Sequence, residues 1–112
     1  MVSVTKTVAA ALALASSSIA GSFTYFYPGL GACGGHNGNN DYIVAVSAKI
    51  FDSQRPCNRR IRAWYKGRSV DVKVVDRCAG CAENDLDFSP AAFKALVGDL
   101  GPGRVWGNWN WI

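Results

Sequence analysis

The chain has 112 residues and 49% of them are hydrophobic, which suits one small domain with a modest core. Lys and Arg outnumber Asp and Glu by 12 to 8, for a formal net charge of +4. Arg59, Arg60 and Arg62 form a cluster of positive charge, but an excess this small argues against a nucleic-acid partner.

The first twenty residues have the pattern of a secretory signal peptide. Lys6 precedes an apolar run over residues 8–15, and Ser18 and Ala20 occupy the small-residue positions of a signal-peptidase site. The run is too short to cross a bilayer. We therefore expect cleavage after Ala20, a mature domain over residues 21–112, and an extracellular product with no membrane partner. The alternative is a buried N-terminal helix.

Four cysteines predict two disulfide bonds in a secreted protein, and three pairings are possible. In a cytosolic protein the Cys78-x-x-Cys81 spacing would instead indicate zinc or a redox site. Zinc would need two more ligands, from Cys33, Cys57 and the single His36. We therefore expect no metal and no cofactor.

The first half of the chain predicts short strands separated by a long loop. The aromatic segment 22–27 predicts a strand that ends at a Pro-Gly pair, and the glycine- and asparagine-rich residues 29–41 predict a loop. Residues 42–51 are apolar enough for a buried strand or a short helix, and periodicity does not choose between them.

The second half predicts a hairpin and one helix. Residues 61–65 and 69–75 flank a Lys-Gly turn, and Asp76 lies where the second strand ends. Residues 89–97 predict the helix, because Ser89 can cap it and Pro90 suits its first position.

Residues 104–112 predict a closing strand, with Val105, Trp109 and Trp111 on one face and Trp106 on the other. We expect Trp109 in the core. Several short strands and one helix in so short a chain favour a small β-barrel held by disulfides.

Three motifs in this order resemble the double-psi β-barrel family. They are GSFTYFYPGLGACG at 21–34, VVDRCAGCAENDLDFSPAAFKAL at 74–96 and GRVWGNWNW at 103–111. The family includes barwin-like proteins, the N-terminal domain of expansins and rare lipoprotein A-like domains, and the chain looks most like the single-domain fungal expansin-like proteins called loosenins. The resemblance implies a mainly β fold over 21–112, a six-stranded double-psi β-barrel with one or two short helices and an open groove for a glycan chain. The barwin-like pattern also implies the disulfides, Cys33 with Cys57 and Cys78 with Cys81.

The resemblance also implies site residues. In expansins the groove floor carries a Thr from the first strand, an Asp at the end of a middle strand and a second Asp before the helix. The matching positions are Thr24, Asp76 and Asp87. Expansins often carry an aromatic residue two positions after the first Asp, and this chain has Cys78 there. We expect Asp85 to lie in solvent.

Aromatic side chains supply candidate platforms on which sugar rings could stack, since aromatic faces pack on the apolar faces of pyranoses. These candidates are Tyr25, Tyr27, Trp64 and Trp106.

The carboxylates argue against hydrolysis. Glycoside hydrolysis normally uses two carboxyl groups, and the related family-45 endoglucanases carry their base on the first strand. Here no Asp or Glu precedes Asp41. A single acid at Asp76 can still bind sugar hydroxyls, or protonate a glycosidic oxygen if burial raises its pKa. In structural terms, Asp76 could instead hold backbone N–H groups, and Asp87 could fix the start of the helix.

The sequence therefore predicts a monomeric, secreted protein that binds and loosens cellulose, chitin or hemicellulose in the cell wall without hydrolysis. Two alternatives stay open. One is a protease inhibitor or defence effector on the same barrel. The other is a lytic transglycosylase or glycan hydrolase that uses Asp76 as its acid.

Overall fold

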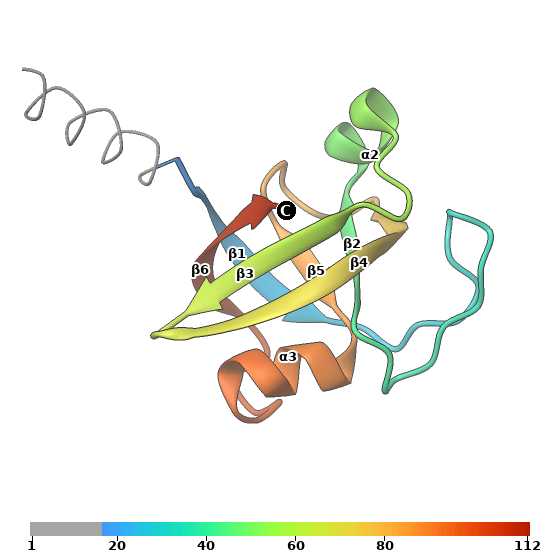
Figure 1. Ribbon diagram of the computed structural model, residues 1–112. Helices are drawn as coiled ribbons and strands as arrows, with labels where there is room; N and C mark the ends of the chain where they lie inside the picture. Colours follow the sequence, from blue (N-terminus) through green and yellow to red (C-terminus); the bar gives the residue numbers. More distant parts are fainter. Residues whose placement is uncertain (1–16) are drawn as a thin grey trace, which may run out of the picture.

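The computed structural model describes residues 17–112, and in this range six strands close into a barrel (Figure 1). The strands are β1 (Ile19–Tyr25), β2 (Ile43–Ser47), β3 (Arg60–Tyr65), β4 (Arg68–Cys78), β5 (Leu86–Phe88) and β6 (Val105–Trp111). Their order around the barrel is β1-β5-β2-β4-β3-β6. The β1–β5 and β2–β4 pairs are parallel and the other pairs are antiparallel. The predicted six-stranded barrel is confirmed.

The apolar segment 42–51 contains both a strand and the start of a helix. Every residue of β2 is buried, so β2 lacks the alternation of buried and exposed residues that usually marks a strand. Ser47 then ends β2 and begins α2 (Ala48–Gln54), where its hydroxyl accepts from the Ile50 amide at 3.1 Å.

Helix α3 (Pro90–Val97) begins as predicted. The Ser89 hydroxyl caps it by accepting from the Ala92 amide at 3.3 Å, and Pro90 occupies the first turn. Its buried side chains include Phe93 and Leu96, which join the barrel core. The two helices lie at opposite ends of the barrel in Figure 1.

Strand β5 was not predicted as a separate element. It has three residues, and it lies between β1 and β2 directly before the α3 cap. Leu86 and Phe88 are fully buried in the core, whereas Asp87 between them is half-buried. The segment therefore presents Asp87 on the outer face of the barrel.

The closing strand β6 has the predicted faces. Trp109 is fully buried and its indole N–H donates to the Asn84 carbonyl at 2.9 Å. Trp106 is 73% exposed, and Trp111 is half-buried against the core.

The two disulfides join Cys33 to Cys57 and Cys78 to Cys81, the pairs implied by the resemblance. The first ties the glycine-rich loop between β1 and β2, which extends from the barrel in Figure 1, to the segment before β3. The second closes the turn after β4. Within residues 17–112, no three His, Cys, Asp or Glu side chains gather as a metal site would require.

The predicted signal peptide falls largely on residues 1–16, outside the described part of the chain. The expected cut after Ala20 lies within β1, where Ile19 pairs with Trp109 and Ala20 pairs with Asn108. In the described range, neither helix has the length and apolar character needed to span a bilayer.

Candidate functional site

A row of four residues crosses four adjacent strands at one level of the barrel. Thr24 of β1 pairs with Asp87 of β5, Asp87 pairs with Ala45 of β2, and Ala45 pairs with Asp76 of β4. Residues paired across strands point to the same face, and Phe23, Val44 and Leu86, which adjoin three members of the row, point into the core. The row therefore faces outward, where Thr24, Asp87 and Asp76 are half-buried and Ala45 is buried. We call Thr24, Asp87, Ala45 and Asp76 the central row. The three polar residues carried over from expansins are thus brought together.

A β-bulge turns Asp76 toward this face. Val44 pairs with Val74, but the next residue, Ala45, pairs with Asp76, so Val75 is an extra residue in β4. An extra residue shifts the inward–outward alternation of a strand by one position. Without it, Asp76 would point into the core with the preceding even-numbered valines of β4.

The Asp76 carboxylate holds the glycine-rich loop. Its Oδ1 accepts from the amides of Ala32 at 2.9 Å and Arg77 at 2.8 Å. The loop approaches closely enough that a Cβ on Gly31 would overlap the Val75 carbonyl oxygen. Asp76 therefore has a structural role as an acceptor of backbone N–H bonds. Its Oδ2 accepts no hydrogen bond from residues 17–112 and is available to a ligand.

The Asp87 carboxyl of the central row has a raised pKa. Burial raises its pKa and the negative charge of Asp76 adds to this, while a hydrogen bond from Thr24 and the positive charge of Arg104 act in the opposite direction. The hydrogen bond is direct, since Thr24 Oγ1 donates to Asp87 Oδ1 at 2.8 Å. The balance is a pKa above the ordinary value of 3.8.

A second polar cluster lies beside the row, and the expectation that Asp85 lies in solvent is wrong. Asp85 Oδ1 accepts from the Ser22 hydroxyl at 2.9 Å, and its Oδ2 accepts from the Ala82 amide at 2.8 Å. Arg104 in turn donates to Ser22 Oγ at 2.6 Å. These partners are 63 and 82 residues apart, so no local sequence pattern could have identified Ser22 and Arg104.

Trp106 is the predicted aromatic platform that the strand register places on the same face as the row. It pairs with Ser22 across β1 and β6, and Ser22 lies two residues from Thr24 on the same face of β1. Because Trp106 is 73% exposed, its ring is free to contact a ligand that crosses the row.

The other predicted platforms lie elsewhere. Tyr25 alternates with Thr24 and packs against the core, with its ring centre 5.0 Å from that of Phe93. Tyr27 follows β1, is 67% exposed, and meets Tyr25 edge-on. Trp64 lies on β3, which adjoins β4, but it pairs with Ser69 at the start of β4, at the other end of that strand from Asp76.

Comparison with known proteins places the chain in a family. A family model described as lytic transglycolase matches residues 18–103. The chain is 36% identical to a putative ripening-related protein 7 of Oryza sativa and 32% identical to a papain inhibitor of Streptomyces mobaraensis. These matches cover 73% and 69% of this chain, and the chain spans only 59% of each relative's length.

Two solved structures share the fold with a TM-score of 0.76. A Streptomyces papain inhibitor is 29% identical, over 87% of this chain and 96% of the inhibitor. A mutant Clavibacter michiganensis expansin in complex with cellohexaose is 25% identical, over 85% of this chain and 50% of the expansin. With the closed barrel and the family match over residues 18–103, the chain belongs to the double-psi β-barrel family described as lytic transglycolase.

Proposed function

We propose that the mature protein, secreted after removal of residues 1–20, binds cellulose, chitin or hemicellulose along the central row and loosens its packing without cutting it. The observation that carries this proposal is the outward row of Thr24, Asp87 and Asp76 with the exposed Trp106 beside it. Hydrogen-bonding carboxylates next to an exposed indole suit a sugar, which has hydroxyl groups around its edge and apolar faces.

The contacts follow from the geometry of the row. Strands are spaced by about 4.8 Å, so the row spans about 14 Å from β1 to β4, enough for more than one pyranose ring. A sugar hydroxyl can donate to the free Oδ2 of Asp76, and Asp87 can accept or donate according to its protonation. These bonds compete with those that join neighbouring chains in the polymer, which is how binding would loosen it.

The placement of the carboxyls supports binding over hydrolysis. Hydrolytic enzymes set two carboxyl groups on either side of the scissile bond. Asp76 and Asp87 instead lie on one face of the barrel with Ala45 between them. Both therefore lie on the same side of a chain that crosses the row.

A similarity to known proteins supports the same ligand class. The expansin that shares this fold was solved in complex with cellohexaose, a glucose oligomer. The identity of 25% and the shared barrel make a related ligand a reasonable proposal for this chain.

One observation favours a second function, lytic cleavage of a glycan. The family description names this activity, and Asp87 has a raised pKa. In such a reaction a carboxyl protonates the glycosidic oxygen as that bond breaks. The sugar's own 6-hydroxyl attacks the anomeric carbon and returns its proton to the carboxylate. The raised pKa of Asp87 suits it to act as this acid.

The test is to incubate the mature protein with cellulose, chitin and peptidoglycan, and to measure both pull-down and soluble sugar. We expect pull-down of a wall polymer without sugar release, weakened in Asp76→Asn and Trp106→Ala. Glu83→Gln is the matched control, because it removes one charge from an exposed carboxyl that pairs with Lys49. Sugar release that is lost in Asp87→Asn would replace the proposal with lytic cleavage. Inhibition of papain without binding to any polymer would replace it with the inhibitor alternative.

A further inference from the structure

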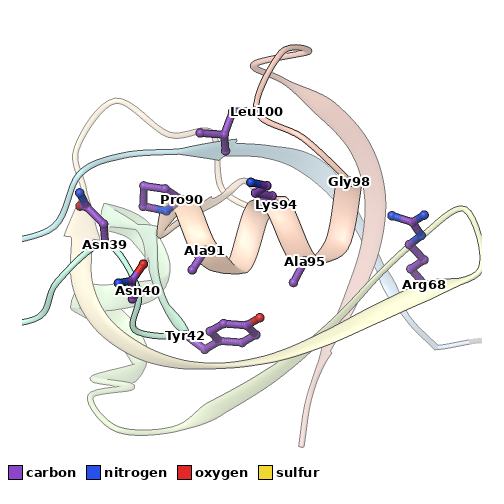
Figure 2. A pocket seen from close by; sticks show the side chains of 10 residues that line it. All are labelled: Asn39, Asn40, Tyr42, Arg68, Pro90, Ala91, Lys94, Ala95, Gly98 and Leu100. Carbon is purple, nitrogen blue, oxygen red and sulfur yellow. The ribbon is translucent and has the colours of Figure 1, made fainter.

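A hollow lies at one side of α3, and none of its lining residues belongs to the central row (Figure 2). Its volume is about 600 Å³. Figure 2 shows the Tyr42 ring facing the side of α3 that carries Ala91 and Ala95, with Arg68 near the C-terminal end of the helix. The hollow is therefore bounded by α3, the start of β4 and the residues just before β2.

The charge of this hollow is positive. Its lining includes Arg68 and Lys94 and no carboxylate. Neither cation forms an ion pair or hydrogen bond with residues 17–112. Other cations of the chain are already paired, Arg62 with Asp71 and Arg77 with Asp52 among them. Arg68 and Lys94 can thus contact an anion without first breaking an existing ion pair.

One of these cations lies beside the C-terminal end of α3. A Cβ on Gly98, the residue that ends the helix, would lie 3.1 Å from Arg68 Nη1. The carbonyl groups at a helix C-terminus carry partial negative charge, which favours a cation there. The guanidinium is therefore positioned at the rim of the hollow.

The neutral lining suits a sugar ring. Tyr42 is 48% exposed and offers an aromatic face, and the side chains of Asn39 and Asn40 offer amide donors and acceptors. Tyr42 also lines a neighbouring hollow that contains Trp64, together with Asp71, whose charge is paired with that of Arg62. The two hollows together form an extended surface, as a polymer needs.

We propose that this surface binds an acidic polysaccharide, a chain of uronic acid residues whose carboxylates contact Arg68 and Lys94 while a sugar ring packs on Tyr42. The site is separate from the central row, so it would add a second ligand class to the one proposed above. Trp64, which sequence reasoning assigned to the groove, would serve this second surface instead.

The test uses polygalacturonate and the same polymer with methyl-esterified carboxyls, which keeps the sugar chain and removes its charge. We expect the native protein to bind polygalacturonate at least about tenfold more tightly, equivalent to roughly 1.4 kcal/mol. The double variant Arg68→Gln with Lys94→Gln should lose this preference. The matched control is Lys49→Gln with Arg55→Gln, which changes the net charge equally at residues outside both hollows. It should keep binding within about twofold.

Four further results bear on the proposal. Equal loss of binding in the two double variants would show that net charge alone attracts the polymer, and would overturn the site. Equal binding of the free and esterified polymers would do the same. If Arg68→Gln disturbs the end of α3, Tyr42→Ala and Lys94→Gln should each still weaken polygalacturonate binding. Unchanged binding in both would overturn the site. Trp106→Ala should retain polygalacturonate binding, which separates this surface from the central row.

Discussion

Thr24 donates its hydroxyl hydrogen to Asp87 across the parallel β1–β5 pair, at 2.8 Å. The two residues are 63 positions apart in sequence, and the bond joins the first strand to the shortest one. It also sets the protonation of the candidate site, because it stabilises the charged form of a carboxyl whose burial favours the neutral form.

Replacing Thr24 with Val should raise the pKa of Asp87 further, because the shape is kept and the donor is lost. The free energy of unfolding should fall by about 1 to 3 kcal/mol, the usual cost of leaving a partly buried acceptor unpaired. NMR titration of the Asp87 carboxyl measures the first effect and urea unfolding the second. Thr24→Ser keeps the hydroxyl and should leave the pKa of Asp87 near its native value. A pKa that falls in Thr24→Val would contradict the role of this bond.

Asp87 should make the protein less stable as pH rises. Its pKa in the folded state lies above the ordinary value of 3.8, so the folded state binds more protons than the unfolded state between these two values. The stability that this group contributes is complete below the unfolded pKa and is lost as pH rises through the folded pKa. Asp87→Asn, which cannot ionise, should therefore gain stability over the native protein between acid and neutral pH.

Thermal unfolding from pH 3 to pH 7 measures whether Asp87→Asn gains stability over the native protein as pH rises. Asp71→Asn is the comparison, because the pKa of Asp71 is shifted in the opposite direction. The hydrogen bonds from Arg62 to Asp71, at 2.7 and 2.9 Å, hold the pKa of Asp71 below 3.8. The stability that Asp71 contributes is thus present above the unfolded pKa and is lost as pH falls. Asp71→Asn should cost less than about 1 kcal/mol at neutral pH, since the pair is largely exposed. At neutral pH, Asp87→Asn should therefore be more stable than the native protein and Asp71→Asn less stable.

Gly31→Ala should displace the glycine-rich loop from Asp76. The added Cβ would overlap the Val75 carbonyl oxygen, and neither backbone can move without disturbing the Ala32–Asp76 bond. We expect a loss of about 1 to 3 kcal/mol in the free energy of unfolding, together with weaker polymer binding. Gly29→Ala is the matched control in the same loop, because a Cβ there meets nothing within 4 Å. Equal losses in the two variants would contradict the proposed overlap.

The two disulfides should contribute unequally to stability. Cys33 and Cys57 are 24 residues apart, whereas Cys78 and Cys81 are only 3 apart. Closing the longer loop removes more entropy from the unfolded chain, so replacing Cys33 and Cys57 with Ser should cost about 3 kcal/mol. The same change at Cys78 and Cys81 should cost less than about 2 kcal/mol. Urea unfolding of the two double variants compares them, and the reverse order would contradict this account.

The elements that could be predicted are those whose signals are local. Ser89 and Pro90, which are adjacent in sequence, mark the start of α3. The Lys-Gly turn marks the β3–β4 hairpin. Strand β5 has no such signal, because its three residues have too little length to show alternation. It forms because Leu86 and Phe88 fill the core between two distant strands.

The candidate site also has residues that could be identified from the sequence and residues that could not. The positions of Thr24, Asp76 and Asp87 came from a family resemblance rather than from their spacing. The Asp85 cluster depends on contacts over long sequence separations, with Ser22 and Arg104, and no pattern in the local sequence indicates them. Strict alternation along β4 would even have placed Asp76 in the core, and only the bulge at Val75 reverses this.

Because of the bulge, the face of the barrel that carries the Asp76 charge depends on how many residues β4 contains before Asp76, and not on which residues they are. Deleting Val75 would leave the chemical composition of the site intact and turn the carboxylate into the barrel. A design that transfers this row to another β-barrel must therefore include the extra residue of the bulge as well as the polar side chains. A related sequence that has an aspartate at this position but lacks the extra residue would place its carboxylate on the inner face of the barrel.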